Sequence, residues 1–133
     1  FSTVGVDADC GETTPDPDPN PDPTPPQGAI KLERGVPYGG LSGRYGYDKL
    51  FYIDVTKDNA SPLSVWNYGG YGRGYPPVLQ VAYNRVPTQT NNDCASTNNS
   101  RSCFIYYPKK GRYFINLSTY WDYFNVTMWA NYN

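Results

Sequence analysis

The residue types that carry most enzymatic chemistry are scarce in this sequence. Histidine is absent from all 133 residues, which removes the commonest general base and the commonest zinc ligand. Neither a Ser-His-Asp nor a Cys-His arrangement can form without it. Carboxylates remain, but the spacing of the aspartates in the domain singles out no acid/base pair: Asp48, Asp54, Asp58, Asp93 and Asp122. Because such residues commonly cap turns or lie on the surface, we expect no catalytic residue, cofactor or metal site in this chain.

The cysteines indicate an oxidising compartment. Cys94 and Cys103 bracket a loop rich in Asn, Ser and Thr, and a disulfide that closes about ten residues stabilises a fold by up to roughly 3 kcal/mol. We expect that bond; the alternative is two free thiols in a cytosolic protein. Cys10 lies far from both in the sequence, so we expect its partner in a region outside this chain.

Aromatic side chains are the main candidates for binding. Tyrosine, present 14 times, combines a flat apolar face with a hydroxyl and suits a proline-rich or collagen-like chain as well as a sugar ring. The candidate substrate-binding residues lie in or beside expected turns: Tyr45, Tyr47, Trp66, Tyr68, Tyr71, Tyr75, Tyr120 and Trp121. The alternative is that these rings pack over loops and strand faces of a domain poor in aliphatic residues.

Short apolar runs separated by Gly, Pro, Asn and Asp predict strands rather than helices. In residues 50–55, Phe51, Ile53 and Val55 share one face of a strand, and Asp54 falls on the other. Further strands are expected at 30–32, 36–41, 63–65, 78–83, 103–107, 112–117 and 123–132, which gives about eight. We expect an all-β domain at residues 29–133, an antiparallel, jelly-roll-like β-sandwich.

Residues 12–28 predict an extended linker rich in proline and aspartate. Proline recurs there at nearly every second position and removes the backbone donors that a helix or sheet needs. About 15 such residues, at roughly 3.1 Å each, would span on the order of 45 Å. We expect a tether to an upstream domain, of which residues 1–11 would be the tail.

Charge and hydropathy exclude two classes of partner. The net charge is -1, yet six of the 12 acidic residues and none of the 11 basic ones lie in residues 1–28, so the remainder is basic on balance. There is no Lys/Arg run and no nucleic-acid motif, and we expect no nucleic-acid partner. No stretch approaches the roughly 20 apolar residues of a membrane span, and the first residues lack a signal-peptide pattern. We expect any export signal to lie upstream.

From Leu32 onward, the order of motifs resembles the bacterial pre-peptidase C-terminal (PPC) domain. The matching segments are Gly35-Val36, Leu41-Ser42-Gly43, residues 51–55, 63–65 and 69–72, Pro87-Thr88, Cys94 with Cys103, Pro108, and residues 111–115. One segment departs from the family, because residues 72–81 lack both aspartates of its usual Gly-Asp-x-Asp-Leu-Tyr-Val motif. Related collagenase-binding domains hold calcium with acidic residues, so this departure puts a calcium site in doubt.

The opening residues 1–10, FSTVGVDADC, resemble the end of thermolysin-family catalytic domains of the vibriolysin and pseudolysin type, where a closing cysteine forms a disulfide. This resemblance implies a secreted bacterial zinc metalloprotease as the parent, with its zinc in an upstream catalytic domain. The chain would then be a non-catalytic accessory domain. It would assist secretion or dock the enzyme on insoluble protein such as collagen, and it is often removed during maturation in such parents.

Two other functions stay open at this point. A carbohydrate-binding module would use stacked aromatic rings and would be retained on chitin or another polysaccharide. A purely structural or chaperone-like segment would have no ligand, and its deletion would impair folding or export. Aromatic turns alone do not encode the repeat that they recognise, so the sequence does not rank the polymers.

Overall fold

The computed structural model describes residues 25–26, 28–44, 46–58, 61–71, 77–96, 101–119 and 121–133, the side chains of residues 70 and 71 excepted. The expected tail at 1–11 and nearly all of the expected linker at 12–28 lie outside these residues. The described part is all-β: β2 (Ile30–Lys31), β3 (Tyr38–Gly43), β4 (Lys49–Val55), β5 (Leu63–Tyr71), β6 (Val78–Tyr83), β7 (Cys94–Ala95), β8 (Ser102–Ile105), β9 (Gly111–Ser118) and β10 (Tyr123–Asn131). It contains no helix long and apolar enough to cross a lipid bilayer.

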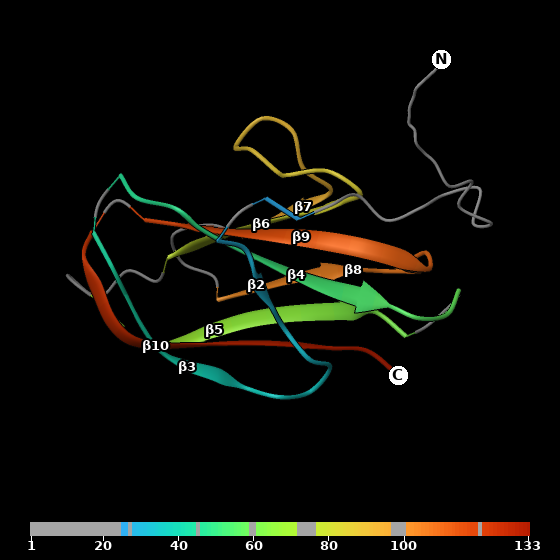
Figure 1. The fold of residues 1–133 in the computed structure, drawn as a ribbon, viewed down its shortest axis with the longest axis horizontal. Coiled ribbons are helices and arrows are strands. Elements are labelled where there is room, and N and C mark those ends of the chain that lie inside the picture. Colours follow the sequence, from blue (N-terminus) through green and yellow to red (C-terminus); the bar gives the residue numbers. More distant parts are fainter. Residues whose placement is uncertain are drawn as a thin grey trace, which may run out of the picture.

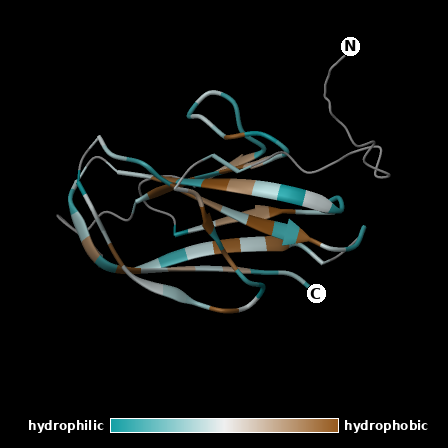
Figure 2. Ribbon diagram, viewed as in Figure 1, coloured by the Kyte–Doolittle hydropathy of each residue, from teal (hydrophilic) through white to brown (hydrophobic). Residues whose placement is uncertain are grey.

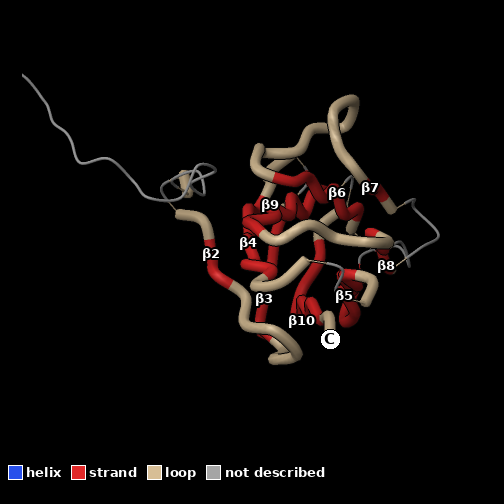
Figure 3. Tube along the Cα trace, turned by 90° about the vertical axis from the view of Figure 1, so that its right-hand side faces the viewer, coloured by secondary structure: helices blue, strands red, loops and turns tan. Residues whose placement is uncertain are grey.

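The strands form two sheets packed face to face (Figure 1). One sheet has four strands in the order β3-β10-β5-β8, and the other has five in the order β2-β4-β9-β6-β7. Figure 3 shows β4, β9 and β6 in one layer and β3, β10 and β5 in the other. The expected sandwich is confirmed.

The pairing of the strands is nested along the chain. β3 pairs with β10, β4 with β9, β5 with β8, and β6 with β7, all antiparallel. The four strands β3 to β6 therefore pair in reverse order with the four strands β7 to β10. The chain forms one long antiparallel ribbon with its turn between β6 and β7. Folding that ribbon over into two layers gives the jelly-roll arrangement, which agrees with the expected fold.

The core forms between the two layers because apolar residues alternate along the strands. In β4, Phe51, Ile53 and Val55 are buried at the positions that the period of two predicts. The hydropathy colours along the strands alternate accordingly (Figure 2). On the opposite face of β4, Asp54 accepts a hydrogen bond of 2.7 Å from Nε of Arg112, whose guanidinium also lies 4.6 Å from the ring centre of Tyr52. The outer face of the five-stranded sheet thus carries an ion pair beside the ring pair of Tyr52 and the buried Phe114.

Four details of the strands differ from the sequence expectations. β7 was not predicted, β3 lies two residues later than expected, and β5 continues to Tyr71 instead of ending near Val65. The two sheets are antiparallel except for β2, which pairs with β4 in parallel. A period of two reports which face of a strand is buried, but it does not report the direction of the neighbouring strand.

Gly69 explains how β5 can extend so far. Its φ of +144° is a backbone conformation that favours glycine. An added Cβ would lie 2.4 Å from the carbonyl oxygen of Asn125, at the irregularity in β10 between Phe124 and Thr127. Glycine is therefore required here by the close approach of two backbones.

Tyr123, at the start of β10, carries a polar atom into the core. Its side chain is only 2% exposed, and its hydroxyl has no hydrogen-bond partner among the described residues. The ring packs on Gly43, where an added Cβ would lie 2.4 Å from Cε1 of Tyr123. Burial, with a smaller contribution from the charge of Asp48, raises the pKa of Tyr123 to about 12.

Candidate functional site

The four-stranded sheet is built from uncharged residues. Its strands β3, β5, β8 and β10 read YGGLSG, LSVWNYGGY, SCFI and YFNVTMWAN, with no Asp, Glu, Lys or Arg. The five-stranded sheet, in contrast, includes Lys31, Lys49, Asp54 and Arg112. The molecule therefore has one charged sheet and one neutral sheet.

The outer face of the neutral sheet carries a row of aromatic rings. Along β5, Leu63, Val65 and Asn67 point into the core and are fully buried, so Trp66 and Tyr68 point outward. Trp129 of β10 lies directly across from Trp66, and Phe104 of β8 lies on the other flank of β5, across from Ser64. We call the following set the aromatic face: Trp66, Tyr68, Phe104, Tyr106 and Trp129.

The rings of the aromatic face are accessible although they contact one another. The exposed fractions are 39% for Trp66, 47% for Tyr68, 38% for Phe104 and 66% for Tyr106. Trp129 is half-buried between its neighbours. Covering an apolar surface of this kind with another molecule is favourable, because it removes apolar area from water.

The rings do not lie in one plane. The ring centre of Trp66 is 5.9 Å from that of Phe104 at an interplanar angle of 84°, and 6.3 Å from that of Trp129 at 66°. Only Phe104 and Tyr106 are close to parallel, at 27° and 6.4 Å. The face is therefore a series of ridges and slots.

Two hollows lie between these ridges. One, of about 310 Å³, is lined by Pro37, Trp66, Tyr68 and Trp129. The other, of about 300 Å³, lies between Trp129 on one side and Phe104 and Tyr106 on the other. Its lining also includes polar side chains, among them Ser64 and Asn131. Trp129 is thus the wall that the two hollows share.

Among the predicted binding residues whose side chains are described, Trp66 and Tyr68 lie on this face. Tyr47 and Trp121, which are 68% and 38% exposed, lie in the loops at the other end of the sandwich, where Gly46 donates to the carbonyl of Thr119. Tyr71 ends β5 at that same end, paired with Tyr123, and its side chain is not described. Tyr45, Tyr75 and Tyr120 lie outside the described residues.

Sequence reasoning missed three members of the face, Phe104, Tyr106 and Trp129. We had selected aromatic residues near expected turns, whereas Phe104 and Trp129 lie inside strands. The alternation of apolar residues could have placed both rings on the outer face. Phe104 adjoins the buried Cys103, and Trp129 lies between the buried Met128 and Ala130. Their grouping around Trp66 depends on strand register, which the pattern does not give.

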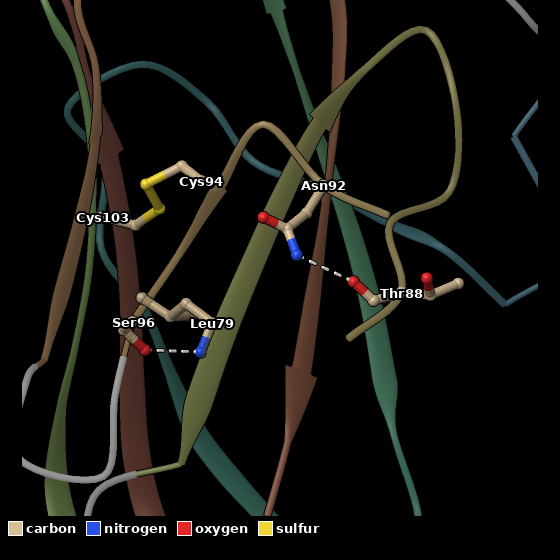
Figure 4. The surroundings of a disulfide bond; sticks show 6 residues. All are labelled: Leu79, Thr88, Asn92, Cys94, Ser96 and Cys103. Atoms are coloured by element: carbon tan, nitrogen blue, oxygen red, sulfur yellow. Dashed lines mark hydrogen bonds between the residues drawn. A yellow bond between two sulfur atoms is a disulfide. The ribbon is translucent and has the colours of Figure 1, made fainter. Parts of the chain in front are cut away.

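The expected disulfide between Cys94 and Cys103 is confirmed, with the two Cα atoms 6.0 Å apart. It joins β7 to β8, and so links the edge of one sheet to the edge of the other (Figure 4). Beside it, the hydroxyl of Ser96 accepts a hydrogen bond of 2.7 Å from the backbone of Leu79. These contacts fix the edge strand β8, which carries Phe104.

Asp93, Asp58 and Asp48, like Asp54, have structural partners. Asp93 accepts hydrogen bonds from Arg85, which hold the pKa of that carboxyl below its usual range. Asp58 accepts from the backbone of Lys110 at 2.9 Å, and Asp48 accepts from the amide of Asn116 at 3.1 Å. Among the described residues no group of His, Cys, Asp and Glu could hold a metal ion.

The curated relatives are bacterial proteases. "Alkaline serine exoprotease A" of Vibrio alginolyticus is 37% identical over 128 residues, which are 95% of this chain and 22% of the relative. "Zinc metalloprotease" of Helicobacter pylori is 34% identical over 130 residues, 96% of this chain and 44% of the relative. "Hemagglutinin/proteinase" of Vibrio cholerae is also 34% identical, over 96% of this chain and 19% of the relative. The chain thus spans between about a fifth and less than half of their lengths.

Solved structures agree on the fold, although no protein-family model matches the chain. The pre-peptidase C-terminal domain of a collagenase from Bacillus anthracis superposes with a TM-score of 0.54 at 15% identity, covering 84% of this chain and 100% of that one. The solution structure named vEP C-ter 100 gives a TM-score of 0.56 at 20% identity, covering 77% and 99%. The chain therefore has the fold of a pre-peptidase C-terminal domain and is homologous, over nearly its whole length, to a segment of bacterial proteases that include a zinc metalloprotease.

Proposed function

We propose that this chain is a non-catalytic accessory domain that docks a secreted bacterial protease on insoluble protein through the aromatic face. The observation that carries the proposal is that exposed aromatic rings group beside two hollows on one sheet, whose strands contain no charged residue, whereas the strands of the other sheet include several. Large exposed rings grouped on one sheet are typical of a binding surface, because burying them against a partner contributes much of the binding free energy.

The relatives support an accessory role. One is named a serine exoprotease and another a zinc metalloprotease, so similar segments accompany two different catalytic chemistries. A segment with that distribution contributes something other than the catalytic mechanism. For this chain we propose a zinc metalloendopeptidase as the parent, on the resemblance of residues 1–10, with zinc held in the upstream domain.

The linker and the disulfide fit the same proposal. A proline-rich tether at residues 12–28 would let the catalytic domain and residues 29–133 engage one insoluble particle together, which raises the effective concentration of each for the particle. It would also offer exposed backbone for removal of the domain during maturation. The Cys94–Cys103 disulfide is of the kind that persists in an extracellular compartment.

Retention on insoluble protein tests the proposal. The full chain is mixed with insoluble collagen, elastin and casein, and bound protein is measured against free protein. We expect saturable binding to at least one of them, and a loss of about tenfold or more in Trp66→Ala, since a buried tryptophan at an interface is worth roughly 2 kcal/mol.

Trp121→Ala is the matched control. Trp121 and Trp66 are exposed to almost the same extent, 38% and 39%, but Trp121 lies outside the aromatic face. Its variant should bind like the unaltered chain. Equal loss in both variants, or no saturable binding to any of the proteins, would refute docking through this face and favour a role in folding or export.

A further inference from the structure

The shape of the aromatic face points to a narrower class of ligand than insoluble protein in general. We propose that it binds an uncharged, proline-rich stretch of protein in the polyproline II conformation, with proline rings entering the two hollows beside Trp129. This inference rests on the proposed docking function and deepens it. Three features of the site carry it: its charge, its ring geometry and its polar rim.

The charge of the face selects a neutral partner. None of the four strands beneath it has an ionisable acid or base at any position except tyrosine. One cation lies at the edge of the face, where the guanidinium of Arg34 is 5.2 Å from the ring centre of Tyr132 beside the second hollow. Over the rest of this apolar surface a charged ligand would lose its hydration and gain no opposite charge in return. Nucleic acid, acidic polysaccharide and strongly charged peptide are therefore poor occupants, whereas a neutral chain meets a surface of matching character.

The ring geometry favours an inserted ring over a stacked one. A sugar chain that lies flat on a binding module needs aromatic planes that face outward together. Here Trp66 makes angles of 84° with Phe104 and 66° with Trp129, so no common platform exists among these three rings. Open hollows lined by aromatic rings lie on either side of Trp129 instead, and aromatic-lined grooves accept the rings of a polyproline II chain.

We assign the two hollows that share Trp129 to residues one repeat apart in that conformation. Polyproline II has three residues per turn and a rise of about 3.1 Å, so residues i and i+3 project from the same side about 9 Å apart. One of them would lie between Trp129 and Tyr68, and the other between Trp129 and Phe104. Trp129 would be covered on both of its flanks.

The rim supplies hydrogen-bonding groups that such a chain lacks within itself. A polyproline II backbone makes no internal hydrogen bonds, so its carbonyl groups need donors from water or from a partner. Ser64 and Asn131 line the second hollow beside the rings. A hydroxyl and a side-chain amide at that place can donate to ligand carbonyls without introducing charge.

The test compares three soluble probes on the full chain. One is a labelled neutral peptide of about 12 residues, four turns of polyproline II with proline at every third position or more often. The second has alanine in place of each proline, and the third is a soluble chitin oligosaccharide. Binding is followed by fluorescence anisotropy. We expect the proline peptide to bind about tenfold or more tightly than the alanine peptide.

Variants locate the binding. Trp129→Ala and the more exposed Tyr68→Ser should each weaken the proline peptide by about tenfold, whereas Trp121→Ala should leave it unchanged. Tyr68→Ser keeps the test valid if Trp129→Ala fails to fold. Equal binding of the two peptides, preferred binding of the chitin oligosaccharide, or loss in Trp121→Ala alone would overturn the proposal.

The failure of this inference can be told apart from failure of the docking function. If no soluble probe binds while insoluble protein is still retained through Trp66, polyproline recognition is wrong and docking stands. If insoluble protein is not retained either, the docking function itself is wrong.

Discussion

Replacement of Tyr123 by Phe should make the domain more resistant to alkali. The hydroxyl of Tyr123 is buried without a partner among the described residues, and the pKa of the side chain is raised to about 12, compared with about 10 in an unfolded chain. The folded state therefore holds this proton to higher pH than the unfolded state does. The stability that depends on it is complete below about pH 10 and is lost as the pH rises toward 12.

The magnitude follows from the two pKa values. Linkage between pKa values of about 10 and about 12 gives a loss of about 1.4 kcal/mol at pH 11, approaching about 2.7 kcal/mol at still higher pH. Tyr123→Phe cannot ionise and should not suffer this loss. At pH 7 the variant should be as stable as the unaltered chain, or more stable by about 1 kcal/mol, because a buried hydroxyl without a partner is removed.

Urea unfolding at pH 7 and pH 11, followed by tryptophan fluorescence, measures the difference. The two proteins share every other tyrosine, so the comparison isolates position 123. Tyr107→Phe is the matched control, since Tyr107 is 84% exposed, and it should behave like the unaltered chain. If Tyr123→Phe lost as much stability between pH 7 and pH 11 as the unaltered chain, the hydroxyl would have to be solvated or hydrogen-bonded, and the reasoning would fail.

Two further substitutions test the fold. Joint replacement of Cys94 and Cys103 by Ser should lower the free energy of unfolding by about 2–3 kcal/mol and the melting temperature by roughly 10 °C, as measured by calorimetry. Cys10→Ser is the control and should have no such effect. An unchanged melting temperature in the double variant would contradict the role of the disulfide. Gly69→Ala should cost more than about 3 kcal/mol in urea unfolding, because the new Cβ would meet a backbone oxygen. Gly40→Ala, which has open space around it, should cost only about 1 kcal/mol, and similar losses at the two glycines would argue against the close approach.

Much of the fold follows from local alternation of apolar residues. The strand at 78–83 was predicted with its observed bounds, and the burial of Phe51, Ile53 and Val55 follows from their spacing. What local patterns could not supply was set by partners distant in the sequence. β7 has two residues and exists because it pairs with β6. The strand expected at 63–65 stops short of Gly69, whereas Gly69 lies within β5, where Asn125 of β10 passes close to it.

The candidate site was predictable only in part for the same reason. Trp66 and Tyr68 could be selected as rings that core packing does not require. Their neighbours Trp129 and Phe104 come from strands that join β5 from opposite sides. The ring angles and the hollows depend on that register, and no property of a single strand encodes them.

The nested pairing of strands has a consequence for when this domain can fold. β3 must wait for β10, and β4 for β9, so the outer ladders of the nested arrangement join residues that are far apart in the sequence. Domains dominated by such distant contacts fold slowly, because a long loop must close before any contact compensates for the entropy lost. During synthesis the sandwich cannot be completed until β10 has left the ribosome. A polypeptide arranged in this way stays open throughout translation, which is the state in which a chain can pass through a narrow translocation pore.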